Sequence, residues 1–302
     1  MTAVTTNDSS IPQVTDKTSV GDIVYFDGRY VSKADVRVSP DDRGFLLGDG
    51  IYEVAAAYDG RFVALDRHMD RLRRSLKEAR IDDAVADPLE TVFQELLERN
   101  GFGESGKSMI YLQVTRGAAP RTHAFPKVPT RPTVYAYAAP FPKDMASLAA
   151  GAGAITRPDM RWSRCDIKVI SLIANVLDNQ LAKEAGCFEA ILIRDGVALE
   201  GTHTSFFGVK NGIVRTAPLS NLILPGITRE ITIEALERAG IVVDQTPIPA
   251  DELQTLDEMF ITGTTTEVVA ILTLDGNQIG DGAIGPVTRE AMTLYRQAAG
   301  IE

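Results

Sequence analysis

The sequence predicts an α+β protein of two domains. Short apolar runs of strand length recur along the chain, and two-residue turn signals such as Asp27-Gly28 and Asn211-Gly212 separate them. Longer segments with apolar residues at helical spacing lie between these runs, the clearest over residues 88–100. A proline-containing stretch at 139–144 breaks both helix and sheet and is typical of a domain linker. The expected division is a flexible tail at 1–20, a small α+β domain at 21–142 and a larger domain at 143–302.

The first half is expected to hold two hairpins, two helices and a pair of longer strands. A helix should follow Asp66 as its N-cap, and the helix at 88–100 should be capped by Asp87, with Pro88 in its first turn. One face of that second helix is apolar, and Gly101 ends it. The expected strands are 23–26 with 30–31, 54–58 with 62–65, 108–115 and 133–138.

The second half is expected to alternate strands with three helices, two of them ended by Gly186 and Gly240. The expected helices lie at 174–185, 227–239 and 286–299, and the expected strands at 152–157, 188–193, 205–209, 213–216, 259–262 and 268–272.

Composition and charge limit the class of function. With a net charge of -10, the chain lacks the surplus of Lys and Arg that nucleic acids and anionic membranes attract. Cys165 and Cys187 have no metal-type spacing, so we expect neither a disulfide scaffold nor a metal site. Residues 1–14 have neither a basic start nor an apolar stretch, and no apolar run is long enough to span a bilayer. These features predict a cytoplasmic enzyme.

A lysine and a glutamate are the first candidates for chemistry. Lys168 lies in an apolar run at 167–173. Either its amine is buried there and its pKa is lowered, as a Schiff-base lysine requires, or the lysine lies on an exposed strand edge. Glu200 ends a predicted strand, where its carboxylate could hold a proton on a pyridine nitrogen or lie in a solvated turn.

Two segments are candidates for anion binding. In residues 225–229 a glycine immediately precedes a predicted helix, which leaves backbone N–H groups free for an anion, and Thr228 adds a hydroxyl donor. The turn at 263–266 is small and rich in donors. Arg121 and His123 lie two residues apart in an extended loop, an arrangement that suits a carboxylate or two solvated side chains.

A series of short motifs follows in order along the chain. They lie at 42–45, 48–54, 68–72, 114–117, 164–168, 186–192, 200–201, 226–229 and in the threonine turn before 267–268. Through them, nearly all of residues 22–297 resembles the class IV aminotransferases, which are pyridoxal phosphate (PLP) enzymes of fold type IV, and within that family the D-amino acid aminotransferases. The resemblance implies a small N-terminal α+β domain and a larger pseudo-barrel domain, with PLP in the cleft between them.

The resemblance also implies a role for each candidate. Lys168 would hold the cofactor through its amine and move the proton of the substrate α-carbon, and Glu200 would pair with the pyridine nitrogen. The phosphate would be bound by Arg71, Ile227, Thr228, Gly263 and Thr264. The substrate carboxylate would be held by Tyr52, Arg121 and His123, the last two supplied by the partner subunit of a homodimer.

The implied reaction is ping-pong transfer of an amino group between a D-amino acid such as D-alanine and a 2-oxo acid such as 2-oxoglutarate. Branched-chain L-aminotransferases typically have Phe-Glu-Gly where this chain has Tyr52-Glu53-Val54, and (R)-selective amine transaminases usually lack the Arg-x-His pair. An aminodeoxychorismate lyase and a ligand-binding protein that has kept the fold are weaker alternatives. One departure from the family pattern is the loop at 202–205, which reads Thr-His-Thr-Ser and puts His203 near the expected site.

Overall fold

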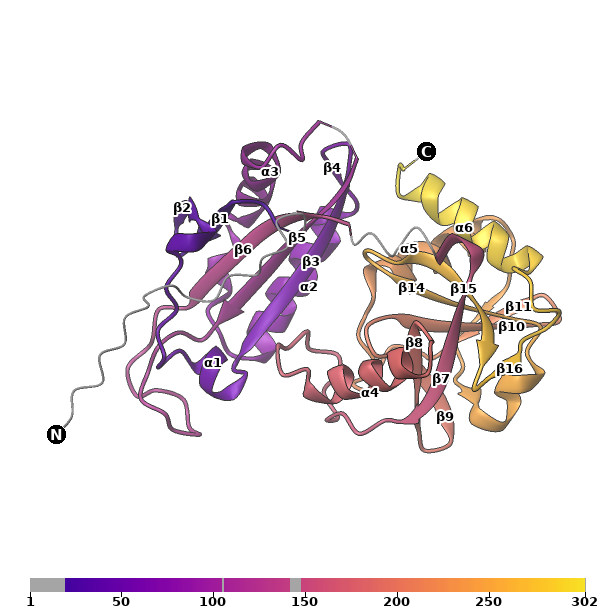
Figure 1. The fold of residues 1–302 in the computed structure, drawn as a ribbon. Coiled ribbons are helices and arrows are strands. Elements are labelled where there is room, and N and C mark those ends of the chain that lie inside the picture. The colour runs from indigo at the N-terminus through magenta and orange to yellow at the C-terminus, as the bar shows by residue number, and fades with distance from the viewer. Residues whose placement is uncertain (1–19, 105, 142–147, 302) are drawn as a thin grey trace.

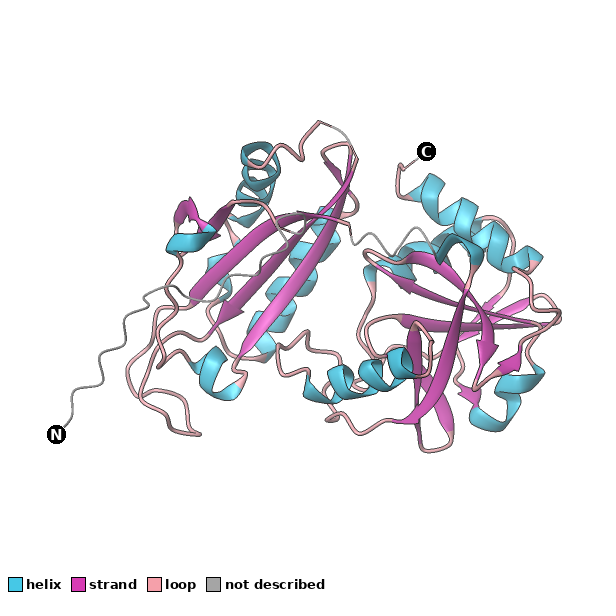
Figure 2. Cartoon of the chain, viewed as in Figure 1, coloured by secondary structure: helices cyan, strands magenta, loops and turns pink. Residues whose placement is uncertain are grey.

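The computed structural model describes residues 20–104, 106–141 and 148–301 of the 302-residue chain. Helices and strands alternate in both halves, and a separate sheet forms in each half, which confirms the α+β prediction (Figures 1 and 2). Of the expected linker at 139–144, residues 142–144 lie outside the described residues, as do residues 1–19 of the expected tail. The predicted domain boundaries therefore stay predictions. Ala139 and Pro140 end a strand that runs from Thr133, so the expectation that this stretch breaks the sheet is wrong for its first two residues, because they pair with Met109 and Ser108.

The sheet of the first half is antiparallel. Within the described residues its strand order is β2-β1-β6-β5-β3-β4. Its strands are β1 (Ile23–Phe26), β2 (Arg29–Ser32), β3 (Gly50–Tyr58), β4 (Arg61–Phe62), β5 (Lys107–Thr115) and β6 (Thr133–Pro140). Both predicted hairpins are confirmed, with Asp27-Gly28 between β1 and β2 and Asp59-Gly60 between β3 and β4. Strand β3 starts earlier than expected because it pairs with β5 along its whole length.

Two helices, α2 (Leu65–Glu78) and α3 (Leu89–Arg99), cover one face of this sheet (Figure 1). The apolar face predicted for the second helix is buried there, against Ile110, Leu112 and Val114 of β5. Because side chains alternate across a strand, Glu53 of β3 points to the helices and Tyr52 to the opposite face. The sheet thus places a buried carboxylate and a tyrosine back to back.

The predicted N-caps of these helices are wrong. At the start of α2, Ala64 adopts a left-handed conformation with φ 45° that turns the chain directly into the helix, so Asp66 lies inside the first turn. Before α3, a 3-10 helix, η2 (Asp83–Ala86), holds Asp87 in a helical conformation, and the cap position passes to Pro88. A side chain caps a helix most often from an extended backbone. Asp87 and Pro88 are both helical, and α3 has no side-chain cap.

The sheet of the second half closes on itself. Among the described residues the pairings run β10-β14-β15-β7-β8-β9, and Ser205 of β10 also pairs with Glu200 of β9, which completes a ring. This ring corresponds to the pseudo-barrel that the resemblance implies. The strands are β7 (Ala152–Pro158), β8 (Glu189–Arg194), β9 (Val197–Gly201), β10 (Ser205–Lys210), β11 (Ile213–Thr216), β12 (Val243–Asp244), β13 (Ile248–Pro249), β14 (Glu258–Gly263), β15 (Glu267–Leu274) and β16 (Asn277–Gln278).

Helices cover the outside of this ring (Figure 2). The helices are α4 (Ile173–Glu184), α5 (Ile227–Arg238) and α6 (Pro286–Ala298), and the short elements elsewhere are α1 (Arg43–Leu47), η1 (Lys33–Asp35) and η4 (Ala250–Thr255). Helix α4 connects the parallel strands β7 and β8, and the segment before it, 159–172, carries the candidate lysine. None of the described helices is both long and apolar enough to cross a membrane.

Candidate active site

A cavity of about 690 Å³ is lined by residues of both halves of the chain. It collects all but two of the side chains predicted for the site. The predicted residues that line it are Tyr52, Arg71, Lys168, Glu200, Ile227, Thr228, Gly263 and Thr264. No group of three or more His, Cys, Asp and Glu side chains in the described part of the chain is arranged to hold a metal ion.

Lys168 is fixed on the cavity wall by its backbone. The Tyr52 N–H donates to the Lys168 carbonyl oxygen at 3.0 Å, and Ile51 forms a β-bridge with Val169. The Lys168 N–H is 3.4 Å from Ser75 Oγ on α2. Its Nζ lies 4.2 Å from the centre of the Tyr52 ring, so the amine contacts the one predicted substrate residue on the same wall. The backbone of the lysine is thus joined to β3, and its side chain lines the cavity.

Glu200 is the second-last residue of β9 and is buried rather than in a solvated turn. One carboxylate oxygen, Oε1, accepts from Arg161 Nη1 at 2.5 Å, and the other accepts from the Leu224 N–H at 3.0 Å. Burial raises the pKa of Glu200 to about 7, although the positive charge of Arg161 opposes that rise. The carboxylate is therefore close to its protonation midpoint at neutral pH.

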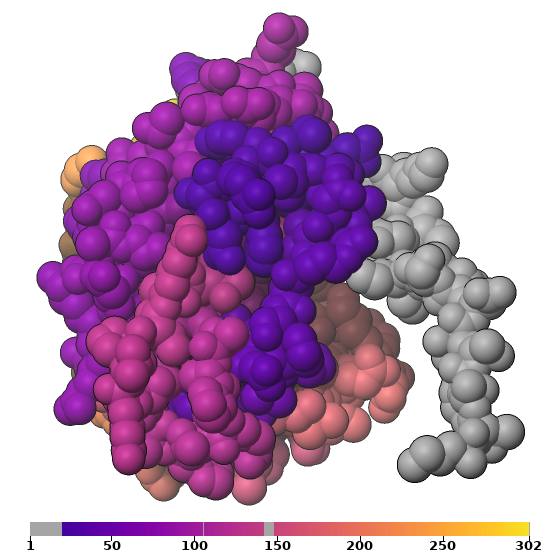
Figure 3. Space-filling model, turned by 90° about the vertical axis from the view of Figure 1, so that its left-hand side faces the viewer, coloured from indigo at the N-terminus to yellow at the C-terminus, as the bar shows by residue number. Residues whose placement is uncertain are grey.

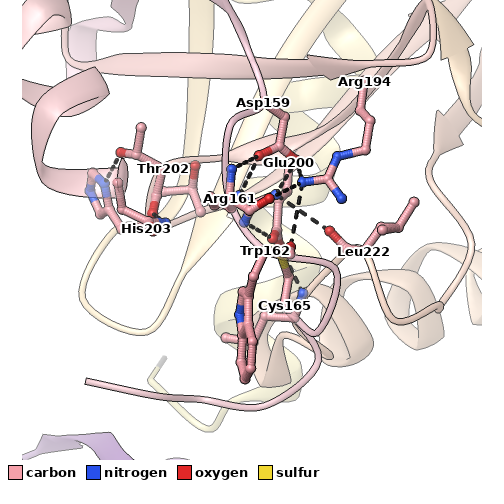
Figure 4. Close-up of polar contacts among 12 residues, drawn as sticks. Asp159, Arg161, Trp162, Cys165, Arg194, Glu200, Thr202, His203 and Leu222 are labelled. Carbon is pink, nitrogen blue, oxygen red and sulfur yellow. Dashed lines mark hydrogen bonds and ion pairs between the residues drawn. The ribbon is translucent and has the colours of Figure 1, made fainter. Parts of the chain in front are cut away.

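Arg161 is a site residue that the sequence did not single out. It lies just after β7 and is held on one side by Asp159 and on the other by Glu200 (Figure 4). Asp159 also pairs with Arg194, from the end of β8. A short-range signal existed, because Asp159 and Arg161 are two residues apart in the segment that leads to Lys168. Only the fold brings Glu200 and Arg194 to them.

The anion end of the cavity combines a helix start with a buried arginine. Helix α5 begins at Ile227 with Gly226 at the cap position and no side-chain cap, so the first N–H groups of the helix have no side-chain acceptor. Arg71 Nη1 donates to the Pro225 carbonyl oxygen at 2.8 Å, which ties α2 to this helix start. Gly263 and Thr264 line the same cavity from the β14–β15 turn. Such a donor set suits a phosphate dianion.

Arg71 is aimed by a carboxylate that the sequence did not identify as functional. Glu53 has no exposed side-chain surface and accepts from Arg71 Nη2 at 2.6 Å and Nε at 3.0 Å. Its Oε1 also lies 3.0 Å from His68 Nδ1. Burial would raise the pKa of Glu53, but Arg71 and His68 hold it well below its ordinary value. With three of its five N–H donors engaged, Arg71 keeps two for an anion.

The loop at 202–205, which departs from the family pattern, is organised by another buried carboxylate, Glu189 of β8. Its Oε1 accepts from the Thr202 hydroxyl at 2.5 Å and the Thr202 N–H at 3.0 Å, and its Oε2 accepts from the Thr204 hydroxyl at 2.8 Å. His203 Nδ1 lies 3.1 Å from the same Oε2, and its ring packs edge-on to Phe188 while nearly half of the side chain stays exposed. Both threonines thus donate hydrogen bonds to Glu189 and hold the loop in place, and His203 lines the cavity beside them.

The structure does not bring Arg121 and His123 to the cavity of their own chain. Both are exposed in the loop between β5 and β6, which lies along α1 at the surface of the first half (Figure 3). Arg43 Nη1 donates to the Thr122 carbonyl oxygen at 2.7 Å and holds the loop there. Two other residues of this region, Arg116 and Phe125, do reach the cavity.

The family model of the class IV aminotransferases matches residues 50–274. The chain is 42% identical to a D-alanine aminotransferase of Bacillus licheniformis, over 91% of this chain and 96% of that protein. It is 37% identical to a D-alanine aminotransferase of Staphylococcus epidermidis, over 88% and 94% of the two chains.

Solved structures agree with this assignment. A branched-chain aminotransferase from Thermoproteus uzoniensis, solved with norvaline, is 28% identical with a TM-score of 0.81 and covers 94% of this chain and 96% of that one. The Escherichia coli branched-chain aminotransferase, 24% identical, shares the fold with a TM-score of 0.83 over 90% and 93% of the two chains. Given the match to the family model over most of its length, this chain belongs to the class IV aminotransferases, the PLP-dependent enzymes of fold type IV.

Proposed function

We propose that this enzyme transfers the amino group of a D-amino acid, with D-alanine as the reference substrate, to a 2-oxo acid such as 2-oxoglutarate. The observation that supports it best is the meeting of Lys168, Glu200 and the Arg71 anion site in one cavity of a chain 42% identical to a D-alanine aminotransferase. A protein that only binds a ligand would not need this lysine in combination with the two carboxylate–arginine pairs, Glu53–Arg71 and Glu200–Arg161.

The residues present fit PLP. Arg71, the N–H groups of Ile227 and Thr228, and the turn at 263–264 offer donors to a phosphate. Glu200 offers a buried carboxylate to a pyridine nitrogen. Lys168 lines the same cavity and offers an amine. When bound, PLP supplies an aldehyde for the amine and a ring that withdraws electrons.

The chain supplies positioning and proton transfer. Lys168 Nζ lies beside Tyr52 on a backbone that β3 holds, so the amine can return to the same place in each half of a ping-pong cycle. There it takes the proton from the α-carbon of the amino donor and delivers a proton to the acceptor. Arg71 would fix the phosphate, and Glu200 would hold the ring nitrogen.

The carboxylate of the substrate is proposed to be held by Tyr52 together with the Arg121 and His123 of the partner subunit in a homodimer. Both loop residues are exposed, and neither lines the cavity of its own chain. Helix α4 presents Ile173, Val176 and Leu177 to solvent with 71, 57 and 59% of their surfaces exposed, which is an apolar stripe that a second copy could cover. The location in the cytoplasm predicted from the sequence is retained as a proposal.

Initial rates with D-alanine, L-leucine and (R)-1-phenylethylamine test the substrate class. We expect the highest kcat/KM with D-alanine, and activity on L-leucine alone would contradict the D-specific proposal. A branched-chain L-aminotransferase is the second candidate, because solved structures of that specificity share the fold. Purified protein should absorb visible light through PLP, and the band should be lost in Lys168→Ala.

The Arg121→Ala variant tests the carboxylate contact. It should reduce kcat/KM for D-alanine much more than for the carboxylate-free amine, because only the amino acid presents a carboxylate to the guanidinium. Equal losses on the two substrates would show that Arg121 does not anchor the carboxylate. Mixing Arg121→Ala chains with Lys168→Ala chains tests whether the two subunits share a site. If they do, a mixed dimer has one site in which both Lys168 and Arg121 are intact, and activity returns.

A further inference from the structure

Four side chains of alternating charge form successive ion pairs that end at Glu200 (Figure 4). Arg194 Nη2 is 3.0 Å from Asp159 Oδ2, and Arg161 donates to Asp159 through Nε and Nη2, both at 2.9 Å. Arg161 Nη1 then donates to Glu200 at 2.5 Å. The side chain of Asp159 has no exposed surface, and those of Arg161 and Glu200 are each 7% exposed. The ion pairs among Asp159, Arg161 and Glu200 are therefore shielded from solvent ions.

Burial pushes Glu200 toward its neutral form, because a charged carboxylate loses its hydration there. The Leu224 N–H is a neutral donor and compensates only in part. Within the described residues, Arg161 is the cation in hydrogen-bond contact with this carboxylate.

The other groups around Glu200 do not replace Arg161. Asp159 carries a negative charge that opposes ionisation of Glu200, and Arg229 of α5 interacts with it without a hydrogen bond. Burial raises the pKa of the Cys165 thiol to about 11, so this neighbour is neutral at physiological pH. Removing Arg161 would leave a buried carboxylate beside a buried aspartate.

We propose that Arg161 is a positioning residue that favours the ionised form of Glu200 over its neutral form, so that a pyridine nitrogen paired with Glu200 would retain its proton. Asp159 holds the guanidinium in its plane, and Arg194 balances the charge of Asp159 so that Arg161 remains available to Glu200. The inference rests on the proposed function. On this proposal, the electron withdrawal by the pyridine ring of bound PLP would depend on Arg161, which is not among the residues predicted for the site.

The test compares Arg161→Met with Arg161→Lys and with Arg157→Met. Arg157 is the matched control, since it lies four residues earlier, on β7, and pairs with Asp178 at 3.1 Å but does not line the cavity. The carboxyl pKa of Glu200 is measured in the full-length protein after removal of PLP, by infrared difference spectra against Glu200→Gln. The visible spectrum of the PLP-loaded enzyme is titrated with pH, and kcat and KM for D-alanine are measured separately.

In Arg161→Met we expect the Glu200 pKa to rise by at least about one unit, which corresponds to a tenfold change in the ionisation equilibrium. The pH titration of the visible band should move in the same direction, and kcat should fall by about tenfold or more while KM stays within about threefold. Arg161→Lys should restore much of each change, and Arg157→Met should match the wild type.

An unchanged Glu200 pKa in Arg161→Met would overturn the proposal. If that variant does not fold, Arg194→Met provides the test. Without Arg194, Asp159 interacts more strongly with Arg161 and weakens its contact with Glu200, so the pKa of Glu200 should rise by a smaller amount. No rise of that pKa in Arg194→Met would also overturn the proposal. A wild type that lacks activity on D-alanine would refute the proposed function alone, since the infrared measurement needs neither substrate nor cofactor.

Discussion

Replacing Glu53 by glutamine is the most direct test of how the anion site is built. The substitution keeps the size of the side chain and removes its charge. Arg71, whose side chain is 5% exposed, would then be a buried cation with no carboxylate partner. His68 cannot compensate, because burial lowers its pKa and keeps the imidazole neutral at physiological pH.

The expected cost follows from this geometry. Glu53 accepts from Arg71 through both oxygens and contacts His68 as well, so the glutamine loses a charge and at least one acceptor. Breaking a buried ion pair from one side costs about 3–5 kcal/mol of the free energy of unfolding. The pKa of Glu53 is depressed in the folded protein, so the pair stabilises above the ordinary value of 4.5 and the stabilisation is lost as the pH falls. The deficit of the variant should therefore persist at neutral pH and shrink in acid.

Urea unfolding of the PLP-free protein, with and without inorganic phosphate, measures this effect. Phosphate should recover part of the deficit of Glu53→Gln, because a dianion at Arg71 replaces the lost negative charge. Glu267→Gln is the control: Glu267 pairs with Lys107 at 2.7 Å and is also largely buried, but it does not line the cavity. A loss below about 1 kcal/mol in Glu53→Gln, or an equal response of both variants to phosphate, would refute the reasoning.

Two further substitutions test other parts of the structure. Burial raises the pKa of Glu200 from 4.5 to about 7, so the PLP-free wild type should lose about 1.4 kcal/mol of unfolding free energy per pH unit between these values relative to Glu200→Gln. Urea titrations at several pH values measure it, and parallel stability curves would contradict the burial of this carboxylate. Gly117→Ala should cost clearly more than Gly101→Ala, by about 1–3 kcal/mol, because a Cβ at Gly117 would lie 2.0 Å from the Arg131 carbonyl oxygen and one at Gly101 meets nothing. Equal costs would mean that only the positive φ at these two positions matters.

Local patterns predicted most of the elements, and packing decided the details. Two-residue turns such as Asp59-Gly60 and apolar faces such as that of α3 are encoded within a few residues, so these predictions are confirmed. Helix starts depend on the preceding chain: the 3-10 helix η2 leaves Asp87 in a helical conformation, so Asp87 does not adopt the extended backbone of a capping residue. The start of β3 at Gly50 likewise depends on a partner strand far away in sequence.

The candidate site divides in the same way. Lys168, Glu200 and the start of α5 could be proposed because each lies in a motif of its own, and all three line the cavity. Arg161 and Glu53 gave no comparable signal, because their partners, Glu200 and Arg71, are 39 and 18 residues away. Long-range pairs between buried charges are created by the fold and cannot be identified from the spacing of residues along the chain.

Two buried glutamates in this cavity region have opposite pKa shifts, and the difference indicates separate tasks. Burial disfavours the charge of both, but Glu53 receives two N–H groups from Arg71 and contacts His68, and its pKa falls. Glu200 receives one donor from Arg161, which Asp159 also binds, and its pKa rises to about 7. A carboxylate whose pKa lies well below its ordinary value stays charged at physiological pH and is suited to hold Arg71 for a phosphate, whereas one near its midpoint responds to a protonated ring nitrogen. The charge of Glu53 is thus fixed at physiological pH, whereas the charge of Glu200 is adjustable.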